Sequence, residues 1–298
     1  MRVLTIANIV PRKLGSYEQF VIDFSRGLTS GGDESLIAFV GPPLDLVGAE
    51  LAAAGAELLP PIPPSALPLR DGMRLVRRVR PAVVHVHFAS IFSPIAAALR
   101  ACGARHVIFT DHASGGFVRR GWLEPVRQAK NRLASASASG ILAVSDFVRR
   151  RLVALGAPAA RVRRIYNGCR VGGAPSRAAA AGGSSGETML VAISQLIAAK
   201  GVDVLLRALA RVAAEGLPFR CRIAGDGPLR AALEAQRDAL GLRERVEFLG
   251  LVSEVRPLLA AGDIFVSVPR WEEAFGLAVA EAMAMGLPAV VSRRAPGA

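Results

Sequence analysis

Cysteine, aromatic residues and long apolar runs are all scarce in this 298-residue chain. The three cysteines are scattered and odd in number, which argues against a disulfide framework and indicates reduced thiols in a cytoplasmic protein. Aromatic residues make up 5% and are not interleaved with arginines, so we expect no nucleic-acid partner. No apolar run reaches the ~18–20 residues that a membrane-spanning helix needs. Cysteine and histidine show no metal-ligand spacing, and we expect no metal or other cofactor.

Lysine is also scarce, because only Lys13, Lys130 and Lys200 contribute to the 37 basic residues. The net charge of +13 lies in the first part of the chain: residues 1–170 hold 23 basic and 11 acidic residues, against 14 and 13 in residues 171–298. This asymmetry predicts a basic patch for an anionic membrane surface or an anionic acceptor. The alternative is a solvated basic surface without a partner. We therefore expect a cytoplasmic protein that lies peripherally at the inner face of the membrane.

The fold class follows from the arrangement of apolar runs. A hydrophobic content of 52% indicates a globular protein, and the length fits two domains. Short apolar runs alternate with helical patterns, which is typical of α/β proteins with parallel sheets. The first half predicts strands at residues 3–8, 35–40, 83–87, 106–110, 140–144 and 162–166. The second half predicts strands at residues 189–194, 219–224, 246–249, 264–268 and 289–291.

The stretch between these two series is rich in Gly, Ser and Ala and has no periodicity. Such a composition is typical of a flexible linker. We therefore predict a first domain over residues 1–170, a linker over 171–188 and a second domain over 189–298. The chain ends shortly after the last expected strand, and a strand without a following helix leaves one face of a parallel sheet uncovered. We expect the second domain to lack its last elements, either as a fragment or as an unusually short domain.

The most informative stretch, residues 271–291, reads WEEAFGLAVAEAMAMGLPAVV. It places Glu273 and Glu281 eight residues apart, across a glycine-containing turn that leads into a helix. Backbone N–H groups at a helix start suit phosphates, and carboxylates suit sugar hydroxyls, so the stretch predicts a site for a sugar nucleotide. The helix is apolar nearly all round, which predicts that Glu281 is surrounded by core positions and needs a polar partner.

Three further residues follow predicted strands, where ligands bind in open α/β sheets. Lys200 precedes a glycine at a helix start, which suits a diphosphate; the alternative is a surface lysine. Gly15 leads into the first helix, with an ordinary turn as the alternative. His112 follows the fourth strand and can reach a substrate, although a structural or surface histidine fits the sequence as well. His85 and His87 alternate on one strand, and we expect both to be structural.

Five ordered motifs resemble the retaining glycosyltransferases of family 4. They are EAFGLAVAE (273–281), EAMAMGLPAVV (281–291), AAKGVDVLLRA (198–208), IAGDGPLR (223–230) and VEFLGLV (246–252). The resemblance implies the GT-B architecture, in which two Rossmann-like parallel-sheet domains face a cleft, the first for the acceptor and the second for the donor. It also implies retaining transfer of a sugar from a nucleotide-sugar donor to a polysaccharide, glycolipid or other acceptor, without an obligatory metal.

The resemblance assigns roles residue by residue. Glu281 would bind the donor's ribose, and Glu273 would bind hydroxyls of the transferred sugar. Lys200 would neutralise the diphosphate leaving group, and His112 would reach the sugar from the first domain. Glu273, His112 and Lys200 form the implied catalytic set. The implied donor-binding set is Gly15, Gln195, Lys200, Gly225, Val252, Glu273, Phe275, Gly276, Leu277 and Glu281.

One departure from the family pattern affects the expected chemistry. Gln195 stands where the family commonly has an arginine on the diphosphate, so stabilisation of the leaving group depends more on Lys200. Two alternatives to an active transferase remain open at this point. One is an inactive fragment that binds nucleotide sugar without turnover, and the other is a sugar-nucleotide epimerase of the same architecture.

Overall fold

The computed structural model describes residues 1–62, 69–112, 123–169 and 186–292. The chain divides into two compact units, Met1–Gly168 and Cys169–Ala298, and each is treated by itself below. Residues 171–185 of the expected linker lie outside the described residues. Thr188, the last residue of that linker, already belongs to the first strand of the second unit.

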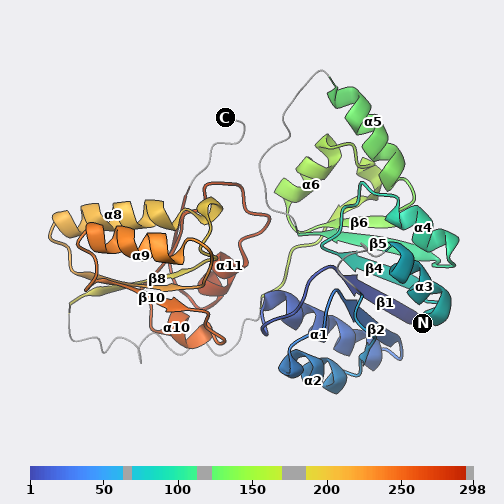
Figure 1. The fold of residues 1–298 in the computed structure, drawn as a ribbon, viewed down its shortest axis with the longest axis horizontal. Coiled ribbons are helices and arrows are strands. Elements are labelled where there is room, and N and C mark those ends of the chain that lie inside the picture. The colour runs from blue at the N-terminus through green and yellow to red at the C-terminus, as the bar shows by residue number, and fades with distance from the viewer. Residues whose placement is uncertain (63–68, 113–122, 170–185, 293–298) are drawn as a thin grey trace. The chain divides into compact units, whose positions relative to one another are not determined.

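The first unit is built on a parallel sheet of seven strands (Figure 1). Its strands are β1 (Arg2–Ala7), β2 (Glu34–Phe39), β3 (Glu57–Leu58), β4 (Val83–His87), β5 (His106–Asp111), β6 (Gly140–Ala143) and β7 (Val162–Arg164). They lie in the order β3-β2-β1-β4-β5-β6-β7. The six predicted strands are confirmed. Strand β3 was not predicted, because its two residues are exposed and show no apolar run.

Helices cover both faces of this sheet. They are α1 (Ser16–Ser30), α2 (Asp45–Ala53), α3 (Leu69–Val79), α4 (Ile95–Ala101), α5 (Glu124–Ser135) and α6 (Asp146–Ala154). Helices α1 and α2 bury Ile22 and Leu51 against Phe39 of β2. Helices α3 and α4 contact each other and lie against the face that carries Ile6 of β1. The alternation of side chains along β1 thus fills two separate layers.

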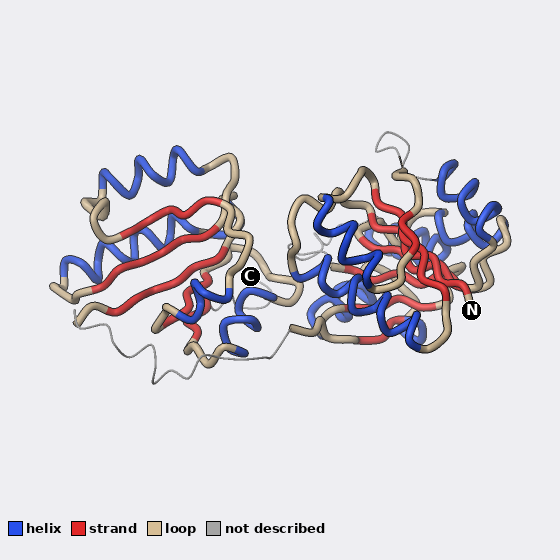
Figure 2. Tube along the Cα trace, turned by 90° about the horizontal axis from the view of Figure 1, so that it is seen from below, coloured by secondary structure: helices blue, strands red, loops and turns tan. Residues whose placement is uncertain are grey.

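The second unit has a five-stranded parallel sheet within the described residues. Its strands are β8 (Thr188–Ile193), β9 (Phe219–Ala224), β10 (Val246–Gly250), β11 (Ile264–Ser267) and β12 (Ala289–Val291), in the order β10-β9-β8-β11-β12. Its helices are α8 (Val202–Ala214), α9 (Arg230–Ala239), α10 (Arg256–Ala260) and α11 (Leu277–Ala284). Figure 2 shows the strands of each unit running side by side, with helices against them.

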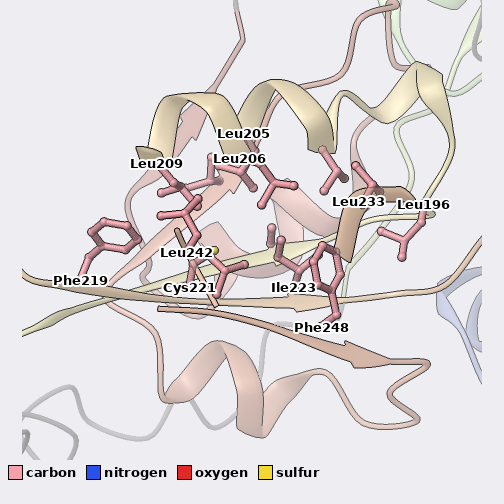
Figure 3. Close-up of a cluster of buried hydrophobic side chains, with 14 residues drawn as sticks. Leu196, Leu205, Leu206, Leu209, Phe219, Cys221, Ile223, Leu233, Leu242 and Phe248 are labelled. Atoms are coloured by element: carbon pink, nitrogen blue, oxygen red, sulfur yellow. The ribbon is translucent and has the colours of Figure 1, made fainter. Parts of the chain in front are cut away.

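Apolar layers hold the second sheet on both faces. In one layer, Leu205, Leu206 and Leu209 of α8 point onto Cys221 and Ile223 of β9 (Figure 3). These helix residues recur at the three- and four-residue spacing of one helical face, which explains why the sequence forms this layer. On the other face, α10 and α11 pack on Val191 and Phe265. Within the described residues, no helix is long and apolar enough to cross a membrane.

Each sheet has one point at which the strand order reverses direction. In the first sheet it lies between β1 and β4, and in the second between β8 and β11. In open α/β sheets, ligands bind beyond the carboxyl ends of the strands at such a switch point. In the second unit, Lys200 follows β8 and Glu273 follows β11. In the first unit, Gly15 follows β1 and His87 is the last residue of β4. The topology therefore places Lys200 and Glu273 at one switch point, and Gly15 at the other beside His87, which was expected to be structural.

The prediction that Glu281 is surrounded by core positions is wrong. The Glu281 side chain is half-buried, Met283 is 63% exposed, and Ala282 is the fully buried residue of α11. The prediction failed because a helix that is apolar nearly all round is expected to be buried on every side. In the structure α11 packs through its Ala282 side on β11 and β12, at the margin of the sheet.

Candidate functional site

An ion pair joins two loops at the switch point of the second sheet. Lys200 ends the short 3-10 turn Ala198–Lys200 after β8, and Glu273 lies in the loop after β11. The ammonium Nζ of Lys200 donates to Oε1 of Glu273. Both side chains are about one-quarter exposed, at 24% and 25%. The sequence predicted a functional role for each residue, but not this contact between them.

Gly201 brings the two loops close together. It adopts φ +67°, and a Cβ at this position would lie 2.1 Å from the carbonyl oxygen of Val268. The N–H of Arg270 also donates to the carbonyl of Ala199 at 2.8 Å. Only glycine fits such a close backbone approach. The glycine after Lys200 therefore holds the start of α8 against the loop that carries Glu273.

A glycine-rich turn after β9 supports the loop of Gln195. Gly225 adopts φ +135°, and a Cβ on it would meet the carbonyl oxygen of Ser194 at 1.8 Å. The N–H of Leu196 donates to the carbonyl of Asp226 at 2.9 Å. Gln195 itself is exposed. The turn at Gly225 thus positions the backbone of the β8 loop, and the side chain of Gln195 is accessible to a ligand.

Helix α11 begins at a glycine and offers backbone N–H groups. Its N-cap, Gly276, adopts φ +80°, and no side chain caps the helix. The neighbours Phe275 and Leu277 are half-buried, as is Val252 in the loop after β10. The first N–H groups of a helix have no partner within it, and the helix dipole favours an anion there. The start of α11 can therefore bind a phosphate or a hydroxyl.

Gly15 in the first unit has a partner within its own helix. It is the N-cap of α1, and its N–H donates to Oε2 of Glu18 at 3.1 Å. A Cβ at Gly15 would lie 2.9 Å from the same oxygen. The family resemblance implies that Gly15 belongs to the donor-binding set. In the structure, the buried carboxylate of Glu18 accepts the hydrogen bond of this amide.

Two side-chain hydrogen bonds connect β4 with β5 and the residue that follows it. Nε2 of His85 lies 2.8 Å from Oγ1 of Thr110, and Nδ1 of His87 lies 3.0 Å from Nε2 of His112. His85 and His87 are both buried and lie on one side of β4, with their ring centroids 4.0 Å apart. The sequence took His87 as structural only. One feature of the sequence could have indicated these two contacts. Residues 85 and 87 are two positions apart, as are their partners 110 and 112, and this is the spacing expected for side chains that meet across neighbouring strands.

Aromatic side chains pack around His112. The ring of Phe88 stacks on His112 at 4.6 Å between centroids, and the edge of Tyr17 meets it at 5.6 Å. Phe20 and Phe24 of α1 pack against His87 and His85, respectively. His112 remains half-buried, whereas His87 is fully buried.

Burial keeps this histidine cluster neutral. Desolvation lowers the pKa of His85 and of His112 from 6.5 to about 4, and it lowers the pKa of His87 well below 6.5. Burial likewise raises the pKa of the Tyr17 hydroxyl. A charged imidazolium loses its hydration in such surroundings, so the neutral ring is favoured at pH 7. His112 is therefore a neutral hydrogen-bonding group rather than a cation. Within the described residues, no group of three or more His, Cys, Asp or Glu could hold a metal ion.

Family models match both units. Residues 17–171, more than half of the chain, match the model described as Glycosyltransferase Family 4. The chain belongs to glycosyltransferase family 4. Residues 187–298 match a second model, described as Glycosyl transferases group 1. The family predicted from the five motifs is therefore confirmed.

Curated relatives of this family 4 member include two with lipid-directed names. It is 32% identical over 224 residues to a phosphatidylinositol N-acetylglucosaminyltransferase chain of Arabidopsis thaliana, covering 74% of this chain and 49% of that protein. It is 43% identical over 110 residues to a GDP-mannose-dependent alpha-(1-6)-phosphatidylinositol dimannoside mannosyltransferase of Mycobacterium tuberculosis, covering 36% and 28%, respectively. The chain spans about half or less of the length of these relatives.

Solved structures share the fold. Anabaena HepE in complex with UDP and glucose superposes with a TM-score of 0.72 at 20% identity, covering 98% of this chain and 80% of that one. WaaG, a glycosyltransferase involved in lipopolysaccharide biosynthesis, gives a TM-score of 0.64 at 16% identity over the same shares. These likenesses confirm the predicted GT-B architecture of two parallel-sheet α/β units, of which the second sheet is the smaller.

Proposed function

We propose that this protein transfers a sugar, with retention of anomeric configuration, from a nucleotide-sugar donor to a lipid-linked acceptor. The observation that carries the proposal is the Lys200–Glu273 ion pair at the switch point of the second sheet. A cation and a carboxylate beside the uncapped start of α11 match the two parts of a nucleotide sugar, its diphosphate and its hydroxyls. HepE has also been solved in complex with UDP-glucose, which agrees with a donor of this class.

Each donor residue has a distinct task in this proposal. Lys200 neutralises the diphosphate as the glycosyl–phosphate bond breaks, which is the main electrostatic requirement of the reaction. Glu273 accepts hydrogen bonds from the sugar, and Glu281 accepts them from the ribose. The amides from Phe275 to Leu277 hold the sugar and the diphosphate. No metal ion is needed when the ammonium and the helix start supply the positive charge.

His112 contributes a contact to the transferred sugar in the same proposal. It follows β5, is half-buried, and is neutral at pH 7 because burial lowers its pKa to about 4. A neutral imidazole can hydrogen-bond a sugar hydroxyl without placing a full charge beside it. The identity of the acceptor is proposed from the relatives' names, which specify phosphatidylinositol lipids.

A donor panel tests the proposal. The purified protein is incubated with UDP-, GDP- and ADP-sugars, with lipid extract as acceptor and with EDTA present in a parallel set. Release of nucleoside diphosphate together with a labelled glycolipid of retained configuration is the expected result. Free isomerised nucleotide sugar without acceptor would instead indicate an epimerase, and EDTA-sensitive transfer would contradict the metal-free mechanism.

Calorimetry tests the donor site separately from turnover. Glu281→Ala should weaken binding of the preferred nucleotide sugar by roughly tenfold or more, because a hydrogen bond to a charged group contributes about 1.5–3 kcal/mol. Glu244→Ala is the matched control, since Glu244 is an exposed carboxylate elsewhere in the second unit. Equal affinities for the two variants would refute the assignment of Glu281.

Membrane attachment is the second part of the proposed function. The apolar side chains of Leu123, the N-cap of α5, and of Val126 and Leu133 within this helix are 52%, 66% and 79% exposed. Lys130 is exposed as well, and the spacing of these four residues places them on one face of the helix. An exposed apolar stripe with a basic residue fits the interface of an anionic membrane. It would bring the protein to a lipid-linked acceptor.

A further inference from the structure

We propose that His87 is a positioning residue that fixes the tautomer and the orientation of His112. In the fixed state, His112 presents its Nδ1–H as a hydrogen-bond donor to the sugar. The tautomer follows from the structure of the first unit by itself, whereas the sugar as recipient rests on the proposed function. Because the two claims have different readouts, one experiment can separate them.

The hydrogen bond joins Nδ1 of one ring to Nε2 of the other and therefore requires the same tautomer in both rings. Nδ1 of His87 and Nε2 of His112 lie 3.0 Å apart, so one nitrogen carries the proton and the other accepts it. Both rings are neutral at pH 7, because burial lowers the pKa of each. A neutral imidazole has one N–H and one bare nitrogen. The proton of His87 therefore determines the proton of His112.

The buried end of His87 decides between the two arrangements. His87 is 0% exposed, and its Nε2 has no hydrogen-bond partner among the described residues. A buried N–H without a partner is rarer in proteins than an unfilled acceptor. The arrangement with a bare Nε2 and a protonated Nδ1 is therefore favoured. Nδ1–H of His87 then donates to a bare Nε2 of His112, and the proton of His112 lies on Nδ1.

The ring of His112 is also held in place. Phe88 stacks on it with an interplanar angle of 23°, and the hydrogen bond to His87 holds its edge. Phe88 adopts φ +56°, which is rare for a bulky residue and costs on the order of 1 kcal/mol or more. Two hydrogen bonds of Asn8 hold this backbone, one to the carbonyl of His87 and one to that of Phe88, both at 3.1 Å. Backbone strain of this kind is concentrated at functional sites.

The consequence is chemical. With its proton on Nδ1, His112 donates a hydrogen bond outward from its pairing with His87, and its basic nitrogen is already occupied. His112 then acts as a hydrogen-bond donor and not as a general base. The opposite tautomer would present a bare Nδ1 and would make His112 a base. Which of the two holds is a measurable property of the protein without substrate.

The test uses the ¹⁵N-histidine-labelled full chain and long-range ¹H–¹⁵N NMR, which distinguishes protonated from bare ring nitrogens. Wild type should show His112 with a protonated Nδ1 and a bare Nε2. His87→Leu removes the donor, and His112 should shift toward the Nε2–H tautomer. His87→Asn should keep the wild-type tautomer, because its side-chain amide can donate from near the position of Nδ1. His85→Leu is the matched control. His85 is buried on the same strand as His87, but it forms its hydrogen bond with Thr110, so the His112 signal should not change.

Kinetics with the preferred donor supply the second readout. His87→Leu should lower kcat roughly 10- to 100-fold, as expected for a misplaced contact group, with a small change in KM, and His87→Asn should restore most of it. A wild-type His112 protonated on Nε2, or an unchanged tautomer in His87→Leu, overturns the proposal. A shifted tautomer with unchanged kcat overturns the contact to the sugar. If wild type neither binds nor uses any nucleotide sugar, the proposed function fails, and the NMR result still decides the role of His87.

Discussion

The ammonium of Lys200 and the carboxylate of Glu273 pair across 73 positions of the chain. The family resemblance gives these residues different targets, the diphosphate and the sugar. Each side chain holds the other in place before a ligand arrives. A bound nucleotide sugar would divide the pair, with its phosphate taking the cation and its hydroxyls taking the carboxylate. The ion pair is therefore a preformed arrangement of the two charges that the proposed reaction needs.

Removing the cation should affect binding far more than stability. Lys200→Ala is expected to weaken binding of a nucleoside diphosphate by roughly ten- to a hundredfold, because a charge-assisted hydrogen bond contributes about 1.5–3 kcal/mol. Thermal unfolding should change little, since a partly exposed ion pair contributes about 0–1 kcal/mol to stability. Calorimetry and a melting curve give the two values. Lys130→Ala is the control, and an equal loss of affinity in that variant would contradict the role of Lys200.

Two glycines with similar backbone angles should respond differently to alanine. Gly201 and Gly216 adopt φ +67° and +77°, but only Gly201 has a carbonyl oxygen where a Cβ would lie. Gly216→Ala should cost about 1 kcal/mol, the penalty for a left-handed residue. Gly201→Ala should cost about 2–4 kcal/mol, because the loop after β11 must move away. Thermal unfolding measures both, and equal losses would show that the close approach of the loops does not hold.

The buried histidines should make the first unit less stable in weak acid. The pKa of His85 falls from 6.5 to about 4 on burial, so below pH 6.5 the unfolded chain binds a proton that the folded chain does not. Stability is therefore full above pH 6.5, falls with pH below it, and levels off below about pH 4. For one histidine the loss between pH 7 and pH 5 is about 2 kcal/mol.

His85→Gln measures that contribution, with urea unfolding followed at pH 7, 6 and 5. The variant should show a shallower loss of stability than wild type, because Gln does not titrate. His106→Gln is the control, since His106 is exposed on β5. His87, His112 and Tyr17 belong to the same cluster, and their contributions to the pH dependence of stability are present in wild type and in both variants. Identical slopes for wild type and His85→Gln would contradict the burial argument.

Vesicle flotation tests the exposed face of α5. The protein should float with anionic vesicles and much less with neutral ones, because one basic residue near such a surface contributes about 1 kcal/mol. Val126→Glu and Leu133→Glu should lower recovery by removing apolar contact and adding like charge. Leu217→Glu, at an apolar residue of the second unit that is 52% exposed, is the control. Equal recovery from neutral and anionic vesicles would contradict membrane attachment.

Most of the fold could be predicted from the sequence, because apolar runs and helical periodicity are local signals. Strand β3 could not, since two exposed residues form a strand only by pairing with β2. The degree of burial of α11 was wrong because it depends on which faces have neighbours. The sequence named Lys200, Glu273 and His112 as candidate site residues, but it did not predict their contacts. The pairing of Lys200 with Glu273 depends on β8 lying beside β11, and that of His87 with His112 on β4 lying beside β5.

The N-terminus of helix α1 already has a carboxylate beside it, that of Glu18 in the same helix. Glu18 accepts from the Gly15 amide, so its negative charge screens the positive end of the helix dipole. A small free anion arriving there meets repulsion as well as attraction and has little else to hold. A larger phosphorylated ligand can use additional contacts to displace the carboxylate. The Gly15 amide is therefore less available to a simple inorganic ion than the amide of a helix start without a neighbouring carboxylate.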